Sequence, residues 1–180
     1  MPRMRDIEAK ISARTKAVMI CNPNNPTGYL YSREELETLK EIALKHNLYI
    51  FADEAYREFS YSGKHFSAMQ LRDVDSNVVL MDTISKRYRA CGARIGAFIS
   101  RNRNLVDTVM KFAQARLSPP SFGQIAGEAA LDLPADYFDA TKMEYTSRRD
   151  LLVNRLNGMP GVICPNPGGA FYAMAKLPIE

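Results

Sequence analysis

Three short apolar runs constrain the fold of this chain more than any other feature of its sequence. They occupy residues 17–21, 48–52 and 78–81, and polar residues follow each run. Continuous apolar runs of this length are typical of strands buried on both faces of a parallel sheet. After the first run, Ser32 and Glu35 form a capping-box pattern at the start of a helical apolar stripe. The order of strand, helix and strand predicts an α/β fold.

The second half of the chain predicts a return strand followed by helices. Residues 95–99 follow the third run too closely for a helical crossover, so we expect an antiparallel strand there. Apolar residues at helical spacing predict a helix over 104–116. Ser121 and Gln124 form a second capping-box pattern, and a longer helix is expected over 136–156. These elements supply the helices that would flank a sheet.

The fold class that these elements predict is α/β. We expect a three-layer, mostly parallel sheet with flanking helices, which forms an incomplete large domain, and the start of a small α+β C-terminal domain. The division is predicted between residues 1–132 and residues 133–180, with the long helix as the bridge. The polar residues before the first run are expected to be only the approach to its strand.

Composition argues against several classes of function. Apolar residues make up 46% of the chain and charged residues 24%, and no apolar run approaches the roughly 20 residues that span a bilayer. The net charge of +4 comes from scattered Lys and Arg, so we expect neither a nucleic-acid nor a membrane partner. The three cysteines lack metal-ligand spacing, and the N-terminus has no secretory signal. We therefore expect no metal and a cytoplasmic location.

Polar side chains gather where the predicted strands end. Six of them are candidate site residues: Asn25, Asp53, Tyr56, Thr83, Lys86 and Arg94. Because parallel strands share one carboxyl edge, where open α/β sheets bind ligands, the residues after the first three runs are expected to converge. Lys86 stands just past the third run, and Arg94 follows eight residues later between two glycines. We interpret Lys86 as a Schiff-base lysine and Arg94 as an anion clamp.

Each of these residues also has a simpler structural interpretation. Asn25 is typical of a turn, and Asp53 can cap the helical turn that follows it. Tyr56 can be a half-buried aromatic residue with a satisfied hydroxyl, and Thr83 can be the polar end of its strand. Only the combination distinguishes a site from these local roles.

The two cationic residues, Lys86 and Arg94, also have structural interpretations that involve no ligand. Lys86, taken alone, is typical of a solvated surface lysine. Arg94 can form an ion pair with a structural carboxylate such as Asp82 instead of binding a ligand. The glycines beside Arg94 can simply permit close packing.

The combination resembles the class I/II aminotransferases that depend on pyridoxal phosphate, an aspartate-aminotransferase-like family of fold type I. The resemblance rests on Asn-Pro-Asn-Asn-Pro-Thr-Gly at 22–28, Phe-Ala-Asp-Glu-Ala-Tyr at 51–56, Thr-Ile-Ser-Lys at 83–86 and Gly-Ala-Arg-Ile-Gly at 92–96. Gly-Gly-Ala-Phe-Tyr at 168–172 resembles the strand that enters the family's small domain. The stretches follow one another in the family's order and spacing.

The resemblance implies pyridoxal 5'-phosphate as the cofactor, and an amino acid and a 2-oxo acid as substrates. Lys86 would form the Schiff base with the cofactor aldehyde and then carry a proton between substrate and cofactor. The family's active sites lie near a subunit interface, which implies a homodimer in the complete protein.

The other five residues receive cofactor-binding roles from the same resemblance. Asp53 would pair with the pyridine nitrogen and keep it protonated. Asn25 and Tyr56 would donate hydrogen bonds to the phenolate oxygen of the ring. Thr83 and Arg94 would hold the phosphate, for which a planar guanidinium fork is well suited.

Several parts of the family's pattern are not found in the 180 residues. These are a small-residue phosphate loop, an aromatic residue that stacks on the cofactor, and an arginine that grips the substrate carboxylate. We therefore expect an internal fragment with weak or no transaminase activity by itself. Alternatives that keep the same cofactor residues are a lyase, a decarboxylase, and a non-catalytic sensing domain of a transcriptional regulator that binds pyridoxal phosphate or an amino acid. A structural remnant that binds nothing is a further alternative.

Overall fold

The computed structural model describes residues 4–134 and 136–179. Its strands are β1 (Ala17–Cys21), β2 (Tyr49–Asp53), β3 (Val78–Thr83) and β4 (Gly96–Ser100). Its α-helices are α1 (Met4–Glu8), α2 (Arg33–Lys45), α3 (Ile84–Arg87), α4 (Arg103–Arg116), α5 (Ser121–Ala129) and α6 (Asp136–Asn157). Short 3₁₀ turns are η1 (Ala68–Gln70), η2 (Cys91–Ala93) and η3 (Ala130–Asp132). Residues 1–3, on which part of the argument against a secretory signal rests, lie outside the described residues.

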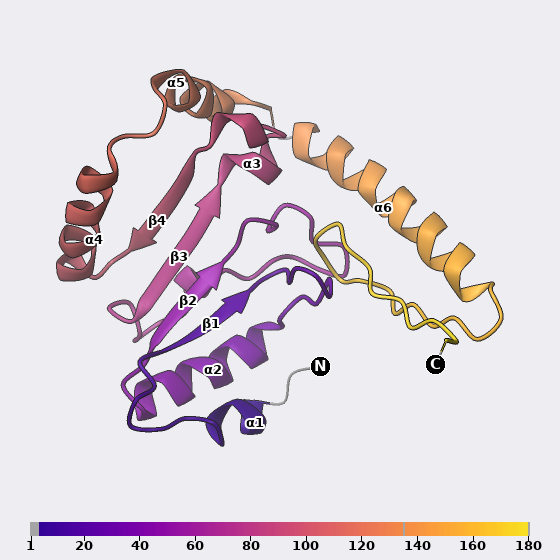
Figure 1. Ribbon diagram of the computed structural model, residues 1–180, viewed down its shortest axis with the longest axis horizontal. Coiled ribbons are helices and arrows are strands. Elements are labelled where there is room, and N and C mark those ends of the chain that lie inside the picture. The colour runs from indigo at the N-terminus through magenta and orange to yellow at the C-terminus, as the bar shows by residue number, and fades with distance from the viewer. Residues whose placement is uncertain (1–3, 135, 180) are drawn as a thin grey trace.

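The strands form one mixed sheet in the order β1-β2-β3-β4 (Figure 1). Strands β1, β2 and β3 are parallel, and β4 is antiparallel to β3. In this register Cys21 lies opposite Asp53, and Asp53 lies opposite Met81. The predicted fold of a mostly parallel sheet with flanking helices is confirmed, and the carboxyl ends of the first three strands meet at one edge.

Helix α2 covers one face of this sheet and begins at the predicted capping box. The Ser32 hydroxyl accepts a hydrogen bond from the Glu35 backbone N–H at 3.2 Å, and the Glu35 carboxylate accepts one from the Ser32 N–H at 2.8 Å. Leu36, Leu39 and Ala43 are buried in the main hydrophobic core, as the helical stripe predicts. Burial of each of the two leucine side chains stabilises the fold by about 1.5–3 kcal/mol.

The segment between β2 and β3 also contributes to the core. Ala68, Leu71 and Val74 are buried against the sheet and α2. Ala68 lies in the turn η1 and the other two residues follow it, and such a short turn has no periodic signal in the sequence. Helix α1 is likewise absent from the sequence-based expectation, which placed only an approach segment before β1.

The second predicted capping box, at the start of α5, is wrong. Ser121 is the first helical residue, the N-cap is Pro120, and no side chain caps the helix. The Gln124 side-chain amide instead donates to the Pro119 carbonyl at 2.8 Å. The two prolines already set the entry of the chain into the helix, which leaves the serine one position too late to cap it.

The helices after the sheet extend away from the α2 side of the molecule. In Figure 1, α4 and α5 lie beyond β4, and α4 contacts that strand. Helix α6 lies on the side of the picture opposite α4 (Figure 1). The chain after it turns back along α6 toward the carboxyl ends of β1 and β2 (Figure 1). Tyr145 of α6 packs edge-on against Phe59 with ring centroids 5.2 Å apart. The predicted division between 1–132 and 133–180 stays a prediction.

None of the helices in residues 4–134 and 136–179 combines the length and apolar character needed to cross a membrane. Within the same residues, no group of three or more His, Cys, Asp and Glu side chains is placed to hold a metal ion.

Candidate active site

The end of β2 brings a carboxylate and a phenol to the carboxyl edge of the sheet. The Asp53 carboxylate accepts a hydrogen bond from the Ala55 N–H at 3.0 Å, so it caps the turn that carries Tyr56. The Tyr56 ring is buried, and its hydroxyl lies 2.6 Å from the Tyr172 hydroxyl. The local role considered for Asp53 is therefore present, and one carboxylate oxygen remains outside that hydrogen bond.

The environment of Tyr56 favours its neutral form. Burial, followed by the hydrogen bond with Tyr172, raises the pKa of the Tyr56 phenol. A hydrogen bond with the Asn25 side chain acts in the opposite direction, because an amide donor stabilises a phenolate. Asn25 itself is exposed on the loop after β1. The structure thus brings Asn25 and Tyr56 together, although 31 positions separate them in the sequence.

Lys86 lies in the last turn of the short helix α3. The Thr83 hydroxyl caps this helix by accepting a hydrogen bond from the Ser85 N–H at 3.1 Å. The Lys86 amine lies 6.0 Å from the centroid of the Phe171 ring. Phe171 in turn packs edge-on against Tyr56 with ring centroids 5.1 Å apart. Lys86 and Tyr56 therefore contact the same aromatic residue. In the sequence, Phe171 stands out only as part of the stretch 168–172 that resembles the family, and no role in the site was predicted for it.

Thr83 and Arg94 line one cavity beside α3. Its volume is about 300 Å³, and its polar lining side chains are Thr83, Ser85, Arg94 and Arg116. Ser85 and Arg116 were not predicted as site residues. Ser85 follows Thr83 by two positions, a local signal that could have found it, whereas Arg116 reaches the cavity only because α4 packs on β4.

Arg94 does not pair with Asp82, the structural partner considered for it. Its backbone is in the left-handed region, with φ of 57°, and its side chain donates to the Cys91 carbonyl at 3.0 Å. Asp82 instead pairs with Arg87 at 2.6 Å and with Arg57 at 3.2 Å. The Arg94 guanidinium therefore has no carboxylate partner among the described residues.

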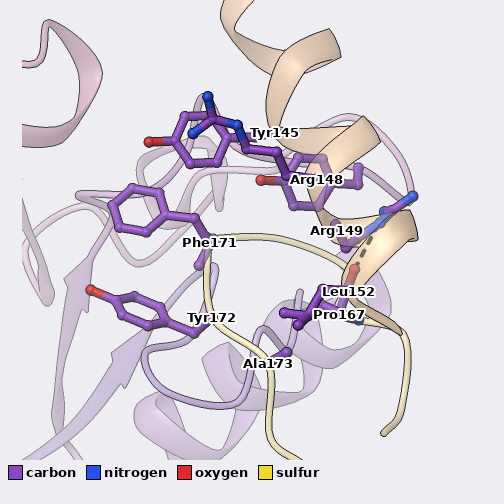
Figure 2. Close-up of a pocket in the computed structure, with 10 residues that line it drawn as sticks. Tyr145, Arg148, Arg149, Leu152, Pro167, Phe171, Tyr172 and Ala173 are labelled. Carbon is purple, nitrogen blue, oxygen red and sulfur yellow. Dashed lines mark hydrogen bonds between the residues drawn. The ribbon is translucent and has the colours of Figure 1, made fainter. Parts of the chain in front are cut away.

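A second cavity, of about 200 Å³, lies between α6 and the segment that carries Phe171 and Tyr172 (Figure 2). Tyr61 lines it as well, and the Arg149 guanidinium lies 4.8 Å from the centroid of the Tyr61 ring. Burial raises the pKa of Tyr61 to about 12. Figure 2 shows Arg149 directed toward Pro167, whose carbonyl accepts its hydrogen bond. Arg149 also pairs with Asp150 at 2.7 Å.

Glycines allow the C-terminal segment to approach the loop after β1. The Gly169 N–H donates to the Gly28 carbonyl at 2.9 Å, and Gly28 has a φ of 68°. A Cβ on Gly28 would lie 2.3 Å from the Pro167 Cβ. This approach is what brings Tyr172 to Tyr56.

We expect the Gly28→Ala substitution to lower the free energy of unfolding by about 1–3 kcal/mol, since it combines backbone strain with overpacking. Urea unfolding followed by circular dichroism measures this change. Gly92→Ala is the matched control, because a Cβ there meets nothing within 4 Å. A Gly28→Ala chain as stable as the Gly92→Ala chain would contradict the packing described above.

Comparison with known proteins gives one consistent result. The model of a family described as aminotransferase class I and II matches residues 2–180. A putative aminotransferase, YugH, of Bacillus subtilis is 36% identical over 173 residues, which are 96% of this chain and 44% of that protein. An aspartate aminotransferase of Bacillus sp. strain YM-2 is 34% identical over 93% of this chain and 43% of its own length.

A solved structure has the same fold. The alanine aminotransferase from Pyrococcus furiosus superposes with a TM-score of 0.91 at 36% identity, over 99% of this chain and 47% of that one. The chain thus spans less than half the length of the proteins it matches. Taken with the fold and the convergence of the strand ends, the match along residues 2–180 shows that this chain belongs to the class I and II aminotransferase family.

Proposed function

We propose that this chain carries the cofactor site of an aminotransferase that uses pyridoxal 5'-phosphate to transfer an amino group from an amino acid to a 2-oxo acid. The proposal rests on one observation: the Lys86 amine and the Tyr56 ring both lie against the same aromatic ring, that of Phe171. They lie at the edge of the sheet where Asp53 ends β2. Open α/β sheets bind their ligands at this edge.

The chemistry of the described side chains fits the cofactor. The cavity lined by Thr83, Ser85 and Arg94 supplies hydroxyls and a guanidinium, which suit a dianionic phosphate. Asp53 supplies a carboxylate suited to a protonated ring nitrogen. Tyr56 supplies a phenol that burial keeps neutral and able to donate a hydrogen bond.

When bound, pyridoxal phosphate supplies an electron sink for the carbanion that forms at the substrate α-carbon. The residues of this chain would hold and orient it. Asp53 would keep a proton on the ring nitrogen, while Asn25 and Tyr56 would fix the ring through its phenolate oxygen. Lys86 would hold the cofactor through Nζ at its aldehyde carbon, with release of water. Once the substrate amine has taken its place on the cofactor, the freed Nζ would accept and return a proton.

The names of the relatives support aminotransfer over the alternatives that share these cofactor residues. The curated relatives include aspartate and alanine aminotransferases, so an amino acid and a 2-oxo acid are the substrates we propose. We also propose that the complete protein acts as a homodimer in the cytoplasm. Lyase, decarboxylase and sensing functions receive no comparable support from these names.

The proposal is tested by mapping where pyridoxal phosphate bonds to the chain. The chain is incubated with pyridoxal phosphate, reduced with borohydride, digested, and analysed by peptide mass spectrometry. We expect the label on Lys86 well before the other lysines. A urea-unfolded sample is the control, in which the label should be spread over all lysines. Labelling of the folded chain that spares Lys86, or that resembles the unfolded pattern, would overturn the proposal.

A further inference from the structure

Next to the candidate site, two arginines and two carboxylates form a closed ring of ion pairs. Arg87 lies 2.6 Å from Asp82 and 3.2 Å from Glu58. Arg57 lies 3.2 Å from the same Asp82 oxygen and 3.5 Å from the same Glu58 oxygen. Each guanidinium therefore bridges both carboxylates. The Arg87–Glu58 contact is an ion pair without a well-aligned hydrogen bond, because the Arg87 Nε–H has no hydrogen-bond partner among the described residues.

The ring joins the two chain segments that carry the candidate site. Arg57 and Glu58 directly follow Tyr56, whereas Arg87 directly follows Lys86. Asp82 stands at the end of β3, immediately before the helix cap at Thr83. Any shift of α3 relative to the turn after β2 would stretch these contacts. The ring is therefore placed to fix the position of Lys86 relative to Tyr56.

Helix α3 needs such an anchor because it is too short to be stable alone. It contains four residues, and a single helical turn forms unfavourably without outside contacts. The Thr83 hydroxyl caps its N-terminal end. At its C-terminal end, Arg87 reaches back to Asp82, and both side chains are nearly buried, with 12% and 11% exposed. Lys86 lies between these two attachments.

We propose that the ring of Arg57, Glu58, Asp82 and Arg87 is a positioning device, with Arg87 as the residue that orients Lys86 toward its proposed cofactor. This inference rests on the proposed function of Lys86. The ring contains equal numbers of positive and negative charges, so it adds no net charge beside the lysine. Its effect on Lys86 is therefore geometric, and misplacing a reacting group by about 1 Å can cost roughly 100-fold in rate.

A positioning role differs measurably from a purely stabilising one. Removing Arg87 alone leaves the nearly buried Asp82 with Arg57 as its one remaining cationic partner among the described residues, which is expected to destabilise the chain. Removing the charges of both Arg87 and Asp82 leaves no such imbalance, and this kind of double replacement is often close to neutral. If the ring only balances charge, the double variant behaves like the parent. If it positions Lys86, the double variant regains stability without regaining the reactivity of the lysine.

The experiment compares the parent chain with Arg87→Met, Arg87→Lys and the double variant Asp82→Asn/Arg87→Met. The initial rate of pyridoxal phosphate labelling at Lys86 is measured after borohydride reduction, and urea unfolding is measured in parallel. We expect Arg87→Met and the double variant to label Lys86 roughly 10- to 100-fold more slowly. Arg87→Lys should lie between them and the parent, because one ammonium group cannot replace a fork that contacts two carboxylates. The double variant should unfold at the parent's urea concentration.

The control variant is Arg103→Met. Arg103 also pairs with a carboxylate, Asp107, but the two side chains are 87% and 60% exposed. Such exposed pairs contribute little, so this variant should label Lys86 within about twofold of the parent. Parent-like labelling in Arg87→Met or in the double variant would overturn the inference.

A measurement without cofactor separates this inference from the proposed function. Hydrogen exchange of the backbone amides in residues 84–89 should be on the order of tenfold faster in Arg87→Met than in the parent. If the parent chain is not labelled at Lys86, the proposed function is refuted. The hydrogen-exchange measurement then tests the positioning role by itself. Unchanged exchange in Arg87→Met would overturn the positioning role in that case as well.

Discussion

Replacing Lys86 by alanine should abolish the visible absorbance band that remains with this chain after pyridoxal phosphate is added and the unbound cofactor is removed by gel filtration. The band depends on a covalent bond to the lysine amine, and alanine offers no nitrogen to form it. The aromatic and polar neighbours of Lys86 remain, so weak non-covalent binding can persist without the band. The spectrum before and after gel filtration measures this difference.

Two further variants make the result specific. Lys86→Arg retains the positive charge over the Phe171 ring, but its guanidinium stays protonated and should also lack the band. Lys111→Ala removes an exposed lysine from α4 and should leave the band unchanged. A band of parental intensity in Lys86→Ala would show that another lysine bonds the cofactor and would refute the assignment of Lys86.

We expect a second large effect, on the pH dependence of the free energy of unfolding, when either Glu54 or His65 is replaced. Glu54 is fully buried, and burial raises the pKa of its carboxyl from 4.5 to about 7, despite hydrogen bonds from Ser67 and Ala68. Burial also lowers the pKa of His65 from 6.5 to about 4. The His65 ring nitrogen lies 3.7 Å from the second Glu54 oxygen. Near pH 5.5 we therefore expect both side chains to be neutral in the folded chain.

The two shifts act on stability with opposite signs. The folded chain binds a proton at Glu54 that the unfolded chain releases between pH 4.5 and 7, so the Glu54 contribution is lost as pH rises through this range. Between pH 4 and 6.5, His65 is protonated in the unfolded chain but neutral in the folded chain. The contribution of His65 to stability is therefore lost as pH falls through this range. Each effect amounts to roughly 3 kcal/mol, and in the parent they largely offset each other where they overlap.

Single substitutions should separate the pH dependence due to Glu54 from that due to His65. His65→Gln leaves Glu54 alone, and the free energy of unfolding should fall between pH 4.5 and 7. Glu54→Gln leaves His65 alone, and the free energy should rise between pH 4 and 6.5. Urea unfolding at intervals across this range measures both profiles. Glu37→Gln, which alters a partly exposed ion pair with Lys40 on α2, should follow the parent within about 0.5 kcal/mol. Identical profiles for His65→Gln and Glu54→Gln would refute the opposite shifts.

Much of the fold could be predicted from the sequence because its signals are local. The apolar runs of β1, β2 and β3 predict buried strands, and the short connection before β4 predicts its antiparallel direction. The capping box at Ser32 predicts the start of α2, since both of its hydrogen bonds form within four residues. The same pattern at Ser121 predicts a cap that does not form, because Pro120 takes the capping position.

The candidate site was predictable only in part. Parallel strands must end at one edge, so the convergence of Asp53 and Lys86 follows from strand order alone. The partner of Tyr56 does not: Tyr172 is 116 positions away, and only the close approach permitted by Gly28 brings the two hydroxyls together. Arg116 reaches the cavity beside Arg94 only through the packing of α4.

Residue type and spacing along the chain were enough to predict the strands, their common edge and a lysine at that edge, because these features are local. The surroundings of Lys86 depend instead on how distant segments pack. The tertiary structure placed Phe171 against the amine, and it paired Asp82 with Arg87 and Arg57 although Arg94 was the partner considered from the sequence. An ion pair or an aromatic contact depends on distances of a few ångströms between distant segments, and those distances exist only once the core has packed.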